Sequence, residues 1–329
     1  MRDSWWVVVT NVSELPASSP LLDLPGAVAG DGVDAGVAVH YGSFNLEQAA
    51  LLAGEAFVDL SNRDVFRVSG PDRLTYLHSL TTAYFEGLTP GTELQALVLD
   101  PQGRVEHYFR GRDDGETFTA HTEPGYGAAL VGFLDRMRFM MRVEVEQLAD
   151  QAVVYRQGAH SLIPRADLGS YAAAAGAPAG MWAYEALRIA RGEPRLGFDT
   201  DDKTIPNELG LLDVAVHLDK GCYRGQETVA RVHTLGRPPR RLTLLHLDGS
   251  LNRLPEVGSA LLDSAGDGAG KTVGRIGSSA RHYELGPIAL ALVKRNVGLD
   301  QTLDADGIPA GQEVIVDPEV GLHVRPRLS

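Results

Sequence analysis

The chain has 329 residues, of which 44% are hydrophobic and 22% are charged, proportions typical of a globular protein with a substantial core. A chain of this length is expected to form two or three compact domains. Its formal net charge of −13 argues against nucleic acid as a direct partner, because an acidic surface repels phosphates unless a local basic patch intervenes.

The single cysteine, Cys222, excludes a disulfide within the chain and a metal centre held by several of its own thiolates. A lone thiol also suits a reducing compartment. The opening segment, Met1–Thr10, has an apolar run of only about five residues, shorter than the roughly 7–15 of a signal peptide. No later segment approaches the about 18 apolar residues of a membrane span. We therefore expect a cytoplasmic protein with no membrane partner.

The first part of the chain mixes helix and strand signals. Residues 13–36 are rich in Pro, Gly, Ser and Asp, which predicts a loosely held lead-in. The elements expected after it are a helix over 45–53, a strand over 65–68, a helix that opens at 69–72, a hairpin of 94–99 and 104–110 around the turn 100–103, a helix over 125–141 and a strand over 142–146. This order favours an α+β fold.

The second part of the chain differs in texture. A break at 172–180 precedes a helix over 181–191 and a long irregular region over 192–228. The short apolar runs beyond it, separated by turn residues, predict a small β-barrel or sandwich with strands at 242–247, 259–263, 272–276, 288–293 and 313–317. We place the domain boundary near residue 240. The expected domains are 1–240, divided into a first α+β subdomain (36–150) and a motif-bearing part (151–240), and a C-terminal β-barrel (241–329).

The segment Lys220-Gly-Cys-Tyr-Arg-Gly-Gln-Glu227 has the strongest chemical content in the sequence. Its two glycines permit a tight backbone and the close approach of a ligand. Cys222 lies between Lys220 and Arg224, whose positive charges should lower the pKa of the thiol. The segment then runs into a helix with Glu227 in its first turn. The alternative is a simple turn in which Cys222 fills a small hole.

This segment resembles the signature of the YgfZ-type folate-binding proteins, a branch of the aminomethyltransferase superfamily that includes the glycine cleavage T-protein. Three further segments are similar to superfamily blocks: Leu60–Thr82, Leu187–Asp199 and Gly286–Val293. The resemblance therefore covers about residues 40–320. It implies an aminomethyltransferase-like fold, in which two intertwined α/β subdomains line a folate site and a C-terminal β-barrel closes it.

The resemblance also implies a function and a set of site residues. Family members bind tetrahydrofolate and support the assembly or repair of iron–sulfur enzymes, so iron–sulfur enzymes or assembly factors are the expected transient partners. The functional Lys and Cys of the family correspond to Lys220 and Cys222, and the folate-side arginine of the superfamily to Arg188. The remaining residues expected to contact a reduced folate are Gly221, Tyr223, Gly225, Gln226 and Glu227. No metal site is expected.

The sequence departs from true aminomethyltransferases at two places. Those enzymes carry an Asp-Asp pair on the strand after the hairpin glycine, and one Asp is central to catalysis. Here the matching residues are Glu106 and His107, and neighbours on a strand point to opposite faces, so only one can reach a pocket. Both could equally be ordinary strand residues. The pterin segment of the Gly-Tyr-Thr-Gly-Glu type is also absent. Both departures count against aminomethyl transfer from a lipoyl carrier.

Two charged stretches have simpler interpretations. The acids Asp199, Asp201, Asp202 and Glu208 fit no metal-ligand spacing and are expected to form a solvated loop. The arginines at 237, 240 and 241, together with His233, are expected to form a solvated linker, with docking of an anionic folate tail as the alternative.

Three alternative functions remain open at this point. The chain could be a folate-dependent one-carbon transferase, which would turn over an aminomethyl or methyl donor. It could be a folate-binding module in which Cys222 is only structural. It could be a folate-dependent tRNA-modification factor, although the acidic charge argues against direct contact with RNA.

Overall fold

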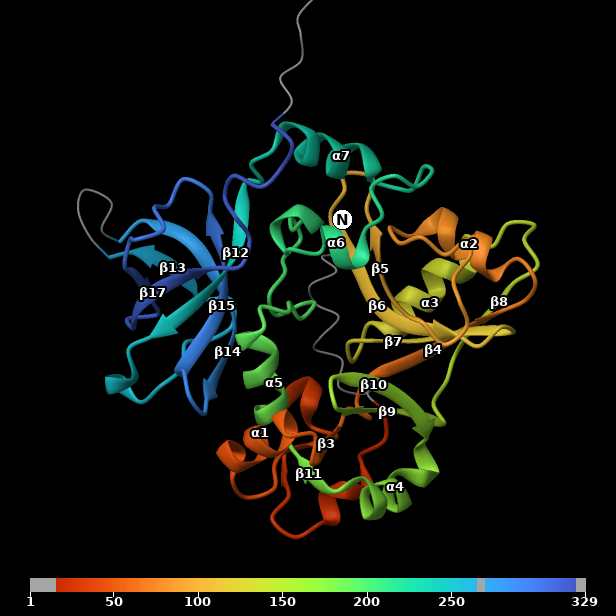
Figure 1. The fold of residues 1–329 in the computed structure, drawn as a ribbon, viewed down its shortest axis with the longest axis horizontal. Helices are drawn as coiled ribbons and strands as arrows, with labels where there is room; N and C mark the ends of the chain where they lie inside the picture. The colour runs from red at the N-terminus through yellow and green to blue at the C-terminus, as the bar shows by residue number, and fades with distance from the viewer. Residues whose placement is uncertain (1–15, 265–269, 324–329) are drawn as a thin grey trace, which may run out of the picture. The chain divides into compact units, whose positions relative to one another are not determined.

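A computed structural model of the chain describes residues 16–264 and 270–323, so the expectation about Met1–Thr10 lies outside the described residues. The chain divides into two compact units (Figure 1). Unit 1 contains residues 1–96 and 107–184, and unit 2 contains residues 97–106 and 185–329. Within the described ranges, no helix is long and apolar enough to cross a membrane.

From residue 16 onward, the segment that precedes the first α-helix is packed, so the expectation of a loosely held lead-in over 13–36 is wrong for its described part; residues 13–15 lie outside the described residues. It contains two 3-10 helices, η3 (Pro20–Asp23) and η4 (Gly32–Asp34), and two paired strands, β1 (Val28–Ala29) and β2 (Ala38–His40). Leu21 is buried against Phe57, and the Ser19 hydroxyl donates a hydrogen bond to the Asp59 carboxylate. Its many Pro, Gly and Ser residues form turns, but a few buried side chains hold the segment in place.

Unit 1 contains a four-stranded sheet with the order β10-β9-β3-β11. Its pairs are antiparallel except for β11, which runs parallel to β3. Two small apolar clusters pack helix α4 against this sheet, around Phe57 and Val154. The elements concerned are α1 (Phe44–Leu52), β3 (Ala56–Asp59), β9 (Gln151–Arg156), β10 (Ala159–Pro164), η5 (Arg165–Asp167), α4 (Leu168–Ala175) and β11 (Ala177–Ala179).

A five-stranded sheet has the order β5-β6-β7-β4-β8. Burial alternates along β6, which is the pattern of a strand with one face in the core. Phe66, Phe109 and Phe118 meet edge to face on that side. The expected hairpin is confirmed, and the helix expected over 125–141 is shorter. The elements are β4 (Asp64–Ser69), α2 (Arg73–Leu80), β5 (Glu93–Leu99), β6 (Val105–Asp113), β7 (Thr117–Thr122), α3 (Gly127–Arg136) and β8 (Glu144–Gln147).

Unit 2 contains a closed barrel with the order β12-β15-β14-β13-β16-β17, drawn in cyan to blue in Figure 1. The expected α+β fold with a C-terminal barrel is therefore confirmed. Its interior is aliphatic, with Leu245, Ile276 and Leu303 fully buried. The barrel elements are β12 (Arg240–Leu247), η7 (Gly249–Leu251), β13 (Ala260–Asp263), β14 (Thr272–His282), β15 (Gly286–Lys294), β16 (Leu303–Ala305) and β17 (Pro309–Val314).

The rest of unit 2 carries the irregular region. The helix expected over 181–191 is α5 (Met181–Ala190), and the boundary between the units falls inside it. The irregular region beyond it contains only the short helices η6 (Pro206–Glu208) and α6 (Leu212–Ala215) before α7 (Gln226–Leu235).

The turn of the β5–β6 hairpin meets the loop before α7 backbone to backbone, and both sides of the contact are glycines. Gly103 and Gly225 have φ values of +81° and +80°, which favour glycine. A Cβ at Gly225 would lie 2.6 Å from the Asp100 carbonyl oxygen, and one at Gly103 would lie 2.7 Å from the Cβ of Thr228. This contact holds the segment Lys220–Glu227, which we call the signature loop, against the hairpin.

We therefore predict that Gly225→Ala destabilises the protein by about 1–3 kcal/mol, because it combines an unfavourable φ with a clash against backbone atoms. Gly221→Ala is the matched control, since a Cβ there meets nothing within 4 Å. That variant should stay within about 0.5 kcal/mol of the parent protein. Urea unfolding of both variants measures the difference, and equal stabilities would contradict the prediction.

Candidate functional site

The signature loop ends in a tight turn that starts α7. Gly225, in the left-handed conformation, is the N-cap residue of this helix. The Gln226 backbone N–H donates to the Tyr223 carbonyl over 3.2 Å, and the Gln226 side chain donates to the Lys220 carbonyl over 3.3 Å. Glu227 lies in the first turn of α7, as expected, where it is exposed and pairs with Arg231. These bonds set the side-chain directions of the loop.

The loop buries its aromatic ring and exposes its thiol. Tyr223 is buried, and burial raises the pKa of its hydroxyl to about 12. The Lys220 ammonium, also buried, lies 5.3 Å from the centre of the Tyr223 ring, within range of a cation–π interaction. Cys222 is exposed, so a reagent or a partner can reach the thiol. Gly221 beside it is exposed too.

Glu106 joins the loop from the hairpin. Its carboxylate accepts a hydrogen bond from Arg224 over 2.9 Å, and both side chains are half-buried. Burial raises the pKa of Glu106 above its ordinary value, and the positive charge of Arg224 only partly opposes this effect. A half-buried carboxyl with a raised pKa, beside a signature loop, has the properties of a functional group.

The side chain of His107 points to the opposite face of β6 from that of Glu106. Its side chain lies on the buried face of β6, with its ring 6.4 Å from the ring of Phe133. The sequence could only state that one member of the pair reaches a pocket. The structure shows that Glu106 lies at the signature loop and that His107 packs inside the sheet's core.

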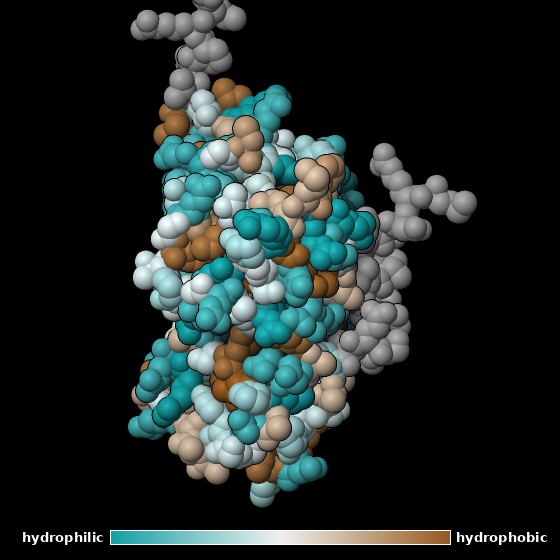
Figure 2. Space-filling view, turned by 90° about the vertical axis from the view of Figure 1, so that its right-hand side faces the viewer, coloured by the Kyte–Doolittle hydropathy of each residue, from teal (hydrophilic) through white to brown (hydrophobic). Residues whose placement is uncertain are grey.

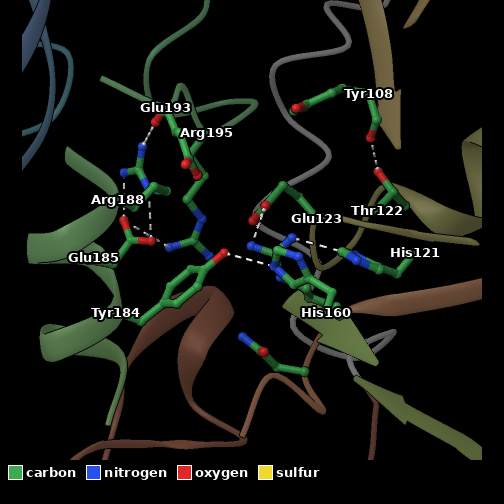
Figure 3. Close-up of polar contacts among 12 residues, drawn as sticks. Tyr108, His121, Thr122, Glu123, His160, Tyr184, Glu185, Arg188, Glu193 and Arg195 are labelled. Carbon is green, nitrogen blue, oxygen red and sulfur yellow. Dashed lines mark hydrogen bonds and ion pairs between the residues drawn. The ribbon is translucent and has the colours of Figure 1, made fainter. Parts of the chain in front are cut away.

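Arg188 is almost completely buried and fully engaged. Its guanidinium donates to the carboxylate of Glu185 over 2.7 Å and to the Glu193 carbonyl (Figure 3). It also donates to the carboxylate of Asp199 over 3.0 Å. Burial disfavours the charged form, but the two carboxylates outweigh burial and raise the pKa of Arg188. Arg188 thus organises the turn after α5. A ligand would contact the residues that surround Arg188 before it could reach the guanidinium itself.

Asp199 ties this turn to the barrel. Its carboxylate accepts bonds from the backbone N–H of Ser278 over 2.6 Å and from the Ser278 hydroxyl over 3.0 Å. It also accepts the Arg195 backbone N–H over 2.8 Å. A Cβ at Gly277 would lie 2.2 Å from the carboxylate, so glycine is required for this approach.

The acidic loop and the arginine stretch are joined by ion pairs. The expectation that they are solvated is wrong for the buried residues Asp199, Glu208 and Arg241 and is confirmed for the exposed residues Asp202 and Arg237. Arg240 bonds the carboxylates of Asp201 and Glu208, the latter fully buried. Arg241 is buried and donates to three backbone carbonyls and to Gln312. Within the described residues, no group of three or more His, Cys, Asp or Glu side chains could hold a metal ion.

Unit 1 contains a buried polar network that sequence reasoning missed (Figure 3). Arg63 pairs with Glu123 over 2.9 Å and contacts His121 over 3.5 Å. His160 contacts the Tyr184 hydroxyl over 3.1 Å, and its ring centre lies 5.0 Å from that of His121. The two histidines lie on the strands β7 and β10, Tyr184 lies on α5, and Arg63 and Glu123 lie in turns, so no local sequence motif predicts the network.

Searches of curated proteins and of solved structures found proteins similar to this chain. No family model matches the sequence. A chloroplastic protein of Arabidopsis thaliana with a provisional transferase name is 25% identical over 327 residues, which cover 80% of this chain and 71% of the relative. The crystal structure of glycine cleavage system aminomethyltransferase T from Bartonella henselae superposes with a TM-score of 0.76 at 17% identity, and the match covers 91% of this chain and 96% of that one.

The matches to proteins named tRNA-modifying protein YgfZ are shorter. The protein from Buchnera aphidicola is 39% identical over 74 residues, and one from Escherichia coli is 40% identical over 77 residues. Each match covers 23% of the relative's length. The chain therefore has the fold of this aminomethyltransferase, and its resemblance to the YgfZ proteins is confirmed.

Proposed function

We propose that the protein binds a reduced folate of the tetrahydrofolate class and supports the assembly or repair of iron–sulfur enzymes. The observation that carries the proposal is the joining of the signature loop to Glu106 through Arg224. It brings the segment that resembles the YgfZ signature to the strand position at which aminomethyltransferases carry their acid. The fold and the YgfZ-type relatives support the same conclusion.

The side chains at this site suit a folate chemically. A folate offers ring N–H groups that a carboxylate such as Glu106 can accept, and anionic glutamate groups that a cation such as Lys220 can pair with. Glycines at 221 and 225, together with Tyr223, leave room for a flat ring beside the loop. Gln226 and Glu227 are further proposed contacts of the folate. Arg188 acts on the folate indirectly, by holding the carboxylates of Glu185 and Asp199 in place.

In this proposal Cys222 is the reactive thiol and Lys220 its activating cation. One thiol is too few to hold a cluster, so contact with iron–sulfur enzymes or assembly factors is transient and involves ligands from the partner. The proposed location is cytoplasmic, with no membrane partner, although the relative from Arabidopsis thaliana is chloroplastic.

A second candidate function is folate-dependent tRNA modification, favoured by the name that the YgfZ relatives carry. The net charge of −13 makes an indirect role, through a modifying enzyme, more consistent with this chain than direct RNA binding. A one-carbon transferase is the third candidate, and the raised pKa of Glu106 is the observation in its favour. Turnover of an aminomethyl or methyl donor would distinguish it.

Lys220→Ala should weaken the binding of tetrahydrofolate at least tenfold, about 1.4 kcal/mol, because it removes the buried cation of the loop. Lys203→Ala is the control, since Lys203 is exposed elsewhere in unit 2. Isothermal titration calorimetry measures both affinities. An absence of heat and of thermal stabilisation with every reduced folate would refute the proposed ligand.

Cys222→Ser should fold normally but fail to restore iron–sulfur enzyme activity in a strain that lacks the gene. Because the thiol is exposed, iodoacetamide should label it in the native protein. Bound folate should slow the labelling. Full restoration of activity by Cys222→Ser would remove the thiol from the mechanism and leave a folate-binding module.

Arg224→Met should raise the pKa of Glu106 further, because it removes the positive charge that opposes the effect of burial. Carboxyl-carbon NMR of the labelled protein reports this titration. Arg231→Met is the control, since Arg231 lies on the same helix but pairs with the exposed Glu227. An unchanged or lower pKa of Glu106 in Arg224→Met would show that the ion pair does not govern its charge.

A further inference from the structure

A cavity of about 290 Å³ lies within unit 1, where strands β6 and β7 face β10. Its volume is close to the lower limit for small-molecule sites, which is about 300 Å³. No residue of the signature loop belongs to it. Apart from three acids, the polar side chains that line it are Arg110, Arg112, Thr119, His121, His160 and Ser161.

The tautomer of His121 follows from its contact with Arg63. The guanidinium of Arg63 can only donate hydrogen bonds, so the Nδ1 atom of His121, 3.5 Å away, must be the acceptor. Burial, together with the positive charges of nearby residues that include Arg63 and Arg110, holds the pKa of His121 well below its ordinary value. The imidazole is therefore neutral, and its proton is on Nε2.

The Nε2–H group of His121 is a buried donor that lacks an acceptor. His121 is only 4% exposed, and Nε2 has no hydrogen-bond partner within the described residues. A buried donor without an acceptor costs about 1–3 kcal/mol, so the site would gain from a ligand that supplies one. The side chain that carries this group lines the cavity.

The acids that line the cavity already have donors of their own. Asp113 accepts two bonds from Arg73, over 2.7 and 2.8 Å, and Asp114 accepts the Thr117 backbone N–H over 2.6 Å. Glu93 accepts from Arg112 over 3.1 Å. The carboxylates of Asp113 and Glu93 are therefore paired with arginines, and that of Asp114 accepts a backbone donor. Around His121, by contrast, the nearby charges are the positive charges of arginines.

We propose that this cavity binds a compact organic carboxylate, whose oxygens accept hydrogen bonds from Arg110 and from the Nε2–H group of His121. The hydroxyls of Thr119 and Ser161 can complete its coordination. Leu162 and the glycines at 91 and 111 leave an apolar wall, so the body of the ligand is small and apolar. The site belongs to unit 1 alone and does not depend on folate binding at the signature loop.

The test is an NMR titration of the full-length protein, labelled with ¹⁵N at histidine, with benzoate and with its neutral isostere benzamide. Before any ligand is added, the His121 signals should show a proton on Nε2 and none on Nδ1. Benzoate should then shift the Nε2 signal of His121 in a saturable manner, and benzamide should not. Inorganic phosphate, titrated separately, tests whether charge alone is sufficient.

Two variants locate the binding site. Arg110→Gln should weaken benzoate binding at least tenfold, and His121→Phe should do the same if it folds. Arg67→Gln, an exposed arginine of β4 paired with Glu146, should leave the affinity unchanged. The proposal is overturned if benzoate and benzamide act alike, if phosphate binds and benzoate does not, if Arg67→Gln weakens binding as much as Arg110→Gln, or if no ligand shifts His121.

Discussion

The carboxylate of Asp199 is the interaction on which the organisation of unit 2 depends. It accepts donors from three segments: the Arg188 side chain of α5, the backbone of the turn at Arg195, and Ser278 of the barrel strand β14. Without it, a buried guanidinium would lose one of its two carboxylates and a buried backbone N–H would lose its acceptor, and each loss is costly in a site closed to water. The irregular region that ends in the signature loop starts from this fixed point.

Local sequence patterns predicted the helices and strands whose stabilising contacts are formed by residues close in sequence. The hairpin around Asp100–Gly103 and the first four barrel strands follow from turn residues and apolar alternation. The short strand β16 was not expected, and β17 begins four residues before the strand expected over 313–317. The same approach missed the β9–β10 hairpin, although Gly158 marks the turn between these two strands. It also missed the packing of the lead-in. The lead-in is fixed by a few buried side chains, such as Leu21 against Phe57, and a bond that joins residues 40 positions apart, Ser19 to Asp59, leaves no local signal.

The candidate site could be predicted only as far as its contiguous part. The loop from Lys220 to Glu227 was recognisable because its functional side chains are adjacent, and the start of α7 followed from its glycine and acid. The choice between Glu106 and His107 required the register of β6, which the sequence does not fix. The ion pairs of Arg240 with Asp201 and Glu208 and the network around Arg63 join residues 32 to 60 positions apart, so spacing could not reveal them.

The chain's division into units has a consequence for how the protein can be cut. The hairpin turn, 97–106, belongs to unit 2 although the sequence on both sides of it belongs to unit 1. A fragment that began at Glu185 would keep the barrel and the signature loop but would lack Gly103, the backbone neighbour of Gly225, and Glu106, the partner of Arg224. Unit 2 therefore includes ten residues that interrupt the sequence of unit 1, and neither unit corresponds to a continuous stretch of the gene.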